Sequence, residues 1–266
     1  MSGHLILKCL WRKVINVDVL QDLFYTNRKV LFKTIRTVFK TQELFIIGIP
    51  YLLIPMIVFS MAGALSFLAG IIIFACISAV ISDYLYVIEF ILKHERFSWD
   101  AFKVGYKVYF RNIFGTLFVL YLVNYGIGLF IQPILRLIPF GGLIIWLLQL
   151  AIVLVINPLP EVFYQKKFDE LDSLNYSIHF MKKNPFSWII PNILLGLVTY
   201  FVYRGVFSLV SVLTYALSYA ISLPIIVIVV ALLLQVVIGF SLVYRGYLFN
   251  ILDNSTRRKR LFKRHM

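Results

Sequence analysis

A few ionisable side chains interrupt the long apolar runs of this sequence, and they are its first candidates for chemistry. The candidates are Asp83, Glu89, Glu161 and Arg245, together with Asn157, which lies four residues before Glu161. A charged group inside a membrane span is costly, so such groups usually face the interior of a helix bundle or a water-filled cavity. We therefore interpret these five residues as a candidate intramembrane polar site.

The deepest of these groups is Asp83. It lies about nine residues, or roughly 13 Å of helix, from the basic end of its apolar run. A carboxyl group at that depth has two interpretations. It binds a proton or a cation, or it accepts a structural hydrogen bond from a neighbouring Tyr or Ser.

Glu89 and Glu161 occupy matching places in the sequence. They are 72 residues apart, and each precedes an aspartate, Asp100 or Asp172, by 11 residues. Arg245 lies at comparable depth in the last apolar run. One interpretation is a structural ion cluster in which at least one carboxylate pairs with Arg245, because an unpaired buried charge is expensive. The other is a polar vestibule that faces the cytoplasm and admits a substrate.

Recognisable catalytic motifs are missing from the sequence. It has no GxSxG elbow, no HExxH pair, no Walker loop and no CxxC pair. Its four histidines lie in interfacial or terminal segments and lack the spacing of metal ligands. We therefore expect neither an enzyme, nor a cofactor, nor a metal site.

The elements that must position these residues are membrane helices. Hydrophobic residues make up 61% of the 266 residues and charged residues only 14%, against about 45–50% and about 25% in soluble domains. The apolar runs, at about 17 to 29 residues, are long enough to cross a hydrocarbon core of about 30 Å. The sequence predicts an all-α integral membrane protein with a single membrane domain.

Three parts of the chain are expected: a basic cytoplasmic segment over 1–43 that contains an interfacial helix, a six-span membrane domain over 44–252, and a basic cytoplasmic tail over 253–266. Prolines should distort two of the spans, Pro50 and Pro55 in the first, and Pro158 with Pro160 near the end of the fourth. The six spans are expected at 44–61, 67–92, 113–135, 143–164, 186–210 and 223–252.

The positive charges indicate which way the chain crosses the membrane. Of the 26 Lys and Arg residues, all but Arg136 and Arg204 fall on the side of the termini when six spans are drawn. The positive-inside rule then places both termini in the cytoplasm, with the protein in the cell membrane. Because the positive residues flank the spans, the net charge of +14 favours anionic membrane lipids as partners over nucleic acid.

A short basic amphipathic segment precedes three of the apolar runs, at residues 30–39, 100–110 and 172–182. Residues 31–40 align with 101–110, and residues 100–112 align with 172–184, with Asp100 matching Asp172. One interpretation is three parallel hairpin repeats, each an interfacial helix followed by two spans. The other is that any membrane hairpin with a basic cytoplasmic flank gives this pattern.

Aromatic residues make up 17% of the chain, which is typical of interfacial aromatic belts. We expect such belts to include the following five side chains: Tyr106, Tyr109, Trp188, Tyr244 and Tyr247.

The third unit, DELDSLNYSIHFMKKNPFSWIIPNILLGLV, resembles a pattern in a loose group of bacterial six-span membrane proteins. That group includes the membrane domain fused to some glycerophosphodiester phosphodiesterases and several uncharacterised families. The resemblance implies a six-span layout, and its specific part is residues 172–185. It carries no catalytic motif, and because the chain shows no phosphodiesterase domain we expect that activity not to carry over.

Two functions fit the sequence. The first is a permease-like or accessory membrane protein that handles a small or lipid-like solute, which predicts an inner cavity lined by Asp83, Glu89, Glu161 and Arg245. The alternative is a membrane scaffold or partner subunit that binds anionic lipid or another membrane protein, which predicts a packed bundle without a cavity.

Overall fold

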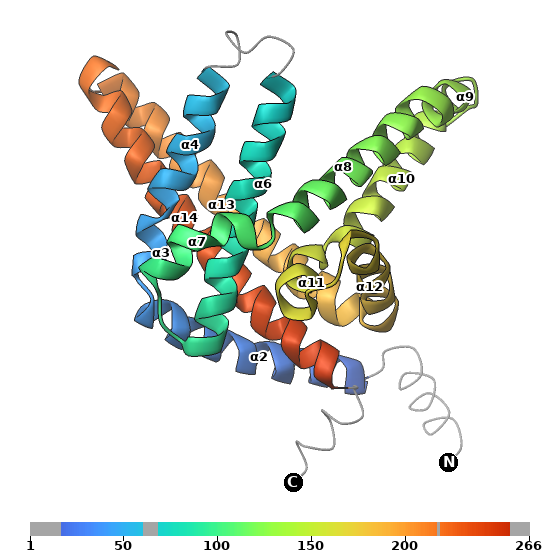
Figure 1. Cartoon of the computed structure of the whole chain (residues 1–266), viewed down its shortest axis with the longest axis horizontal. Helices are drawn as coiled ribbons and strands as arrows, with labels where there is room; N and C mark the ends of the chain where they lie inside the picture. The colour runs from blue at the N-terminus through green and yellow to red at the C-terminus, as the bar shows by residue number, and fades with distance from the viewer. Residues whose placement is uncertain (1–16, 61–68, 217–218, 256–266) are drawn as a thin grey trace, which may run out of the picture.

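The computed structural model describes residues 17–60, 69–216 and 219–255, and all regular secondary structure in these ranges is helical. Residues 1–16 of the predicted N-terminal segment, residues 256–266 of the predicted tail and the start of the predicted second span lie outside the described residues. The helices, shown in Figure 1, are α2 (Val17–Lys40), α3 (Glu43–Ile46), α4 (Gly48–Ser60), α6 (Ala69–His94), α7 (Trp99–Val108), α8 (Phe110–Gly126), the π-helical segment η2 (Ile127–Ile131), α9 (Gln132–Arg136), α10 (Gly141–Ile156), α11 (Leu159–Lys166), α12 (Glu170–Lys183), α13 (Pro185–Ala216) and α14 (Tyr219–Asn254).

Six helical segments of the described chain are long and apolar enough to cross a membrane. The predicted all-α fold with six spans is therefore confirmed, and the protein has the helices of a multi-pass membrane protein. These segments are Glu43–Ser60, Ala69–His94, Phe110–Arg136, Gly141–Lys166, Pro185–Leu209 and Leu232–Asn254.

The segments predicted as amphipathic helices are helical, except that the second, predicted over 100–110, ends at Val108 and Phe110 already begins α8. The first belongs to a longer helix, α2, which crosses the bundle at the end where the described chain begins and ends (Figure 1). The second is α7, whose first turn is capped by Ser98, since its hydroxyl accepts a hydrogen bond from the Ala101 amide. The third is α12. We call the end of the bundle that α2 crosses the basic end.

Two of the predicted proline effects are helix breaks, near Pro50 and at Pro158, whereas Pro55 lies inside the continuous helix α4. Helices α3 and α4 are separated at Ile47, three residues before Pro50, which has no N–H to donate to the Ile46 carbonyl. The third span widens into η2 just before Pro133, and the fourth breaks into α10 and α11 at Asn157 and Pro158.

The turn between α9 and α10 depends on a glycine. Phe140 has a left-handed backbone conformation with φ of 65°. A Cβ added to the next residue, Gly141, would lie 1.6 Å from the carbonyl oxygen of Leu135. Only glycine lets the chain reverse this tightly.

The core lies toward the basic end, around α6 and α14. Ile88 and Ile91 of α6 pack there with Leu248 and Phe249 of α14, and all four side chains are fully buried. Helices α6, α11 and α14 contact one another in pairs. These three helices carry Glu89, Glu161 and Arg245, so the fold brings the three matching positions of the sequence to one region.

Candidate functional site

Arg245 forms the ion pair that the sequence predicts. Its Nε lies 2.7 Å from Oε1 of Glu161 and its Nη2 lies 2.8 Å from Oε2, so the two planar groups meet in a two-pronged contact. The Glu161 side chain is completely buried and that of Arg245 is 16% exposed. An ion pair removed from water needs this geometry, because neither charge has solvent to stabilise it.

The helix break at Asn157 and Pro158 completes this pair. Arg245 donates a further hydrogen bond of 2.6 Å from Nη2 to the Asn157 carbonyl oxygen. The Asn157 side chain in turn accepts a 2.8 Å hydrogen bond from the indole of Trp188, and the Arg245 guanidinium lies 5.3 Å from the centre of that ring. We call Asn157, Glu161, Trp188 and Arg245 the Arg245 network.

Glu89 does not join the Arg245 network. Its carboxylate is 5% exposed and lies 2.5 Å from the Lys93 ammonium and 3.3 Å from that of Lys167. Tyr109, at the junction of α7 and α8, donates its hydroxyl to the same carboxylate. Burial, together with that hydrogen bond, raises the pKa of Tyr109 above its ordinary value, so the phenol stays protonated as a donor. Glu89 thus links α6 to the α7–α8 junction and forms ion pairs with two lysines.

Asp83 lies apart from both groups. Tyr51 of α4 donates a 2.9 Å hydrogen bond to its Oδ2, which is the structural hydrogen bond named as one of its two interpretations. Its Oδ1 is buried and has no hydrogen-bond partner among the described residues. Gly105 of α7 closes over it so tightly that a Cβ there would lie 2.3 Å from Oδ1. Ser82 holds α7 in place, because its hydroxyl donates to the Gly105 carbonyl and accepts from the Tyr109 amide.

The predicted five-residue site is therefore divided among three places. Asn157, Glu161 and Arg245 are brought together, whereas Glu89 and Asp83 each have other partners. A functional role for any of the five stays a prediction. Among the described residues no group of three His, Cys, Asp or Glu side chains is arranged to hold a metal ion.

A cavity of about 530 Å³ opens at the basic end between α2, α6, α11 and α14. Of the four residues expected to line an inner cavity, only Glu89 reaches it. Sequence reasoning did not assign the rest of its polar lining. We call it the lysine cavity, since five lysines and two carboxylates line it: Lys29, Lys33, Lys93, Lys166, Lys167, Glu89 and Asp253.

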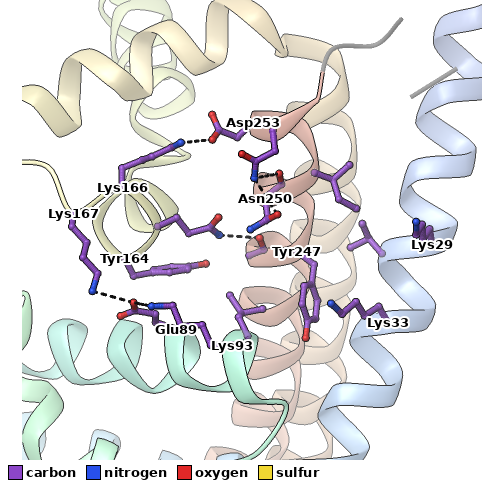
Figure 2. Close-up of a pocket in the computed structure, with 16 residues that line it drawn as sticks. Lys29, Lys33, Glu89, Lys93, Tyr164, Lys166, Lys167, Tyr247, Asn250 and Asp253 are labelled. Carbon is purple, nitrogen blue, oxygen red and sulfur yellow. Dashed lines mark hydrogen bonds and ion pairs between the residues drawn. The ribbon is translucent and has the colours of Figure 1, made fainter. Parts of the chain in front are cut away.

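The five lysines differ in how far they are neutralised. Lys166 pairs with Asp253, and Lys93 and Lys167 share the single carboxylate of Glu89, as Figure 2 shows. Lys33 has a weaker ion pair: its ammonium lies 4.0 Å from a Glu95 carboxylate oxygen, and it also lies 4.2 Å from the centre of the Tyr247 ring.

Lys29 has no ion pair among the described residues. The side chains of Lys93 and Lys167 are each 58% exposed. The cavity is therefore positive and reaches the protein surface.

Helix α2 presents three faces around its axis. One face packs on the bundle, where Thr37 shares a 3.0 Å hydrogen bond with Tyr247 and Thr34 is fully buried. A second face is a row of basic residues at helical spacing, which includes Lys29 and Lys33. The third face is exposed and apolar, with Phe24 and Phe39 exposed by 70% and 72%. The spacing of these lysines could be seen in the sequence, but the opposite wall of the cavity, on α6, α11 and α14, could not.

The predicted aromatic belt is wrong at four of its five positions. Tyr106 is exposed, but Tyr109, Trp188, Tyr244 and Tyr247 are at least 93% buried inside the protein. Each buried ring has a hydrogen bond: Tyr244, for example, donates to Asn27 of α2. Rings with one polar atom suit a membrane interface and a buried hydrogen bond equally well, which is why sequence did not separate the two.

Comparison with protein-family models, curated proteins and solved structures finds no match to this chain. The resemblance of residues 172–185 to a group of six-span membrane proteins therefore stays a prediction.

Proposed function

We propose that this chain is a permease-like or accessory membrane protein that binds a small or lipid-like anionic solute in the lysine cavity. The observation that carries this proposal is the cavity itself, in which five lysines face two carboxylates. Its volume of about 530 Å³ lies in the range of about 300–1,000 Å³ that is typical of small-molecule sites.

We place the cavity on the cytoplasmic side of the cell membrane. The support is the charge distribution. The lysines of the cavity are among the Lys and Arg residues expected on the side of the termini. Arg136, one of the two exceptions, lies on α9, at the far end of its hairpin from the basic end (Figure 1). The parallel hairpin repeat is part of the same proposal. Its support is that Glu89, Glu161 and Arg245 lie on α6, α11 and α14, which contact one another.

A specific observation favours the second candidate, a scaffold that binds anionic lipid along its surface. Helix α2 carries exposed apolar side chains such as Phe24, Phe32 and Phe39, and basic residues such as Arg28 and Arg36 lie beside them. A helix of this composition is suited to lie in the plane of a membrane interface. This surface would bind lipid without using the lysine cavity.

Two matched double variants separate the two candidates. Lys29→Gln/Lys33→Gln removes the two least neutralised cations of the cavity without touching the partners of Glu89. Lys103→Gln/Lys107→Gln removes two exposed lysines of α7 that do not line the cavity.

The measurement is the thermal midpoint of the detergent-purified protein during titration with short-chain phosphatidylglycerol, with phosphatidylcholine as the uncharged comparison. A ligand that binds only the folded state raises the midpoint. We expect phosphatidylglycerol to stabilise the wild type and the α7 variant, and to lose most of its effect on the cavity variant. Equal stabilisation of both variants would contradict cavity binding and favour the surface scaffold.

A further inference from the structure

We propose that the lysine cavity recognises a phosphate monoester, the form of phosphate ester that carries two negative charges, in preference to phosphodiesters with one. This inference rests on the proposed function and names the ligand class of the same site. Its first ground is charge balance. Among the lining residues the five lysines exceed the two carboxylates by three positive charges. The Glu95 carboxylate lies 4.0 Å from Lys33 and closer to Lys40, so it offsets at most one of them. A dianion therefore neutralises more of the excess than a monoanion.

The second ground is the placement of the lysines. Lys29 and Lys33 project from α2, and Lys93 and Lys167 lie across the cavity on α6 and at the end of α11 (Figure 2). A phosphate monoester has three strong acceptor oxygens on one atom, so cations from two walls can reach it together. A phosphodiester has two such oxygens, and its second substituent occupies the third direction.

The third ground is that the lysines can bind a ligand without abandoning Glu89. An ammonium group has three N–H donors. Lys93 and Lys167 each use one contact on the Glu89 carboxylate, at 2.5 and 3.3 Å, and have donors to spare. Glu89, held by Tyr109, therefore positions the two lysines, and its single negative charge does not neutralise both of them.

Apolar side chains complete the lining and bear on the rest of the ligand. Val30, Leu92 and Ile251 line the cavity beside the lysines. They suit the carbon part of a phosphate ester better than bare inorganic phosphate. The shared chemistry is the monoester, whether it is the headgroup of a lipid or a soluble phosphorylated metabolite.

The test compares two lipids at two pH values with the wild-type protein. Short-chain phosphatidate is a phosphate monoester and short-chain phosphatidylglycerol is a phosphodiester, and binding of each is measured by native mass spectrometry and by thermal midpoint. At pH 7.5 we expect phosphatidate to bind roughly five- to tenfold more tightly. At pH 5 the monoester carries one charge, because its second pKa is about 6, so the preference should disappear while phosphatidylglycerol binding changes little.

Competition distinguishes the two sources of the monoester. Glycerol phosphate that displaces phosphatidate at equal concentration identifies a soluble ester as ligand, and displacement only at large excess identifies the lipid headgroup. Either result supports monoester recognition. Equal affinity for the two lipids at both pH values, lost in Lys29→Gln/Lys33→Gln, would overturn the inference and leave the proposed function standing. Binding of neither lipid would overturn both.

Discussion

Helices α6 and α14 differ from α8, α10 and α13 in how much of each span is packed against protein. Of the most apolar stretch of each span, 39% in α6 and 44% in α14 is buried, against 17% in the α8 span and 11% in the α10 span. The α13 span resembles the latter, at 17%. We call α6 and α14 the packed helices and α8, α10 and α13 the open helices; the first span, at 18%, is buried no more than these.

Polar side chains account for this difference. In a membrane, apolar side chains gain nothing by leaving lipid for protein, so helices associate where they pack closely or share hydrogen bonds. The packed helices carry Asp83, Glu89, Gln235 and Arg245, and each is bonded to another element. Between Leu143 and its break, helix α10 is aliphatic apart from Trp146 and Gln149, which are both exposed, and the helix remains mostly exposed.

The largest effect is expected from removing the cation of the Arg245 network. Arg245→Ala leaves Glu161 buried and unpaired, which should lower the free energy of unfolding by about 3–5 kcal/mol. Arg204→Ala on the open helix α13, where the arginine is exposed, should change it by at most about 0.5 kcal/mol. Denaturant unfolding of the detergent-purified protein measures both.

A second variant shows whether the loss comes from the unpaired charge. Adding Glu161→Gln to Arg245→Ala removes that charge, so the double variant should recover part of the stability. A double variant less stable than Arg245→Ala alone would mean that packing around the arginine, and not the pair, holds the helices together.

Glycine substitutions should give a smaller effect with opposite signs in the two regions. Gly105→Ala on α7 would push a Cβ to within 2.3 Å of Asp83 on the packed helix α6, and we expect a loss of about 1–3 kcal/mol. Gly196→Ala on α13 meets nothing within 4 Å, so the better helix propensity of alanine should stabilise by up to about 1 kcal/mol. Thermal midpoints that fall for both would show that α13 is packed against a partner.

The smallest effect is expected from a single hydroxyl. Tyr51→Phe removes the hydrogen bond to Asp83 and should cost about 1 kcal/mol. Tyr121→Phe on the open helix α8, where the ring is 57% exposed, should be neutral. Equal midpoints for these two variants would show that the Asp83 hydrogen bond contributes nothing to the packed region.

The features that could be predicted from the sequence depend on how deep a residue lies in the membrane and on the energetic cost of burying it. The features that were missed depend on the direction in which a side chain points. Span lengths follow from hydropathy, the break at Pro158 from a missing N–H, and the presence of a carboxylate partner for Arg245 from the expense of a buried charge. The sequence did not predict that α11 would turn Glu161 toward Arg245 while Glu89 pairs with lysines. The lysine cavity was missed for the same reason. Its walls come from four helices, and no local sequence pattern specifies how each helix is rotated about its own axis.

The most direct measurement of the lysine cavity is the reactivity of individual lysines toward an acetylating reagent, quantified by mass spectrometry with and without short-chain phosphatidate. If the cavity is an anion site, Lys29, Lys33 and Lys93 should lose reactivity severalfold on addition of the lipid. Lys103 and Lys107 of α7, which do not line it, should be unchanged. Equal protection of the cavity lysines and the α7 lysines, or protection of neither group, would contradict an anion site at the basic end.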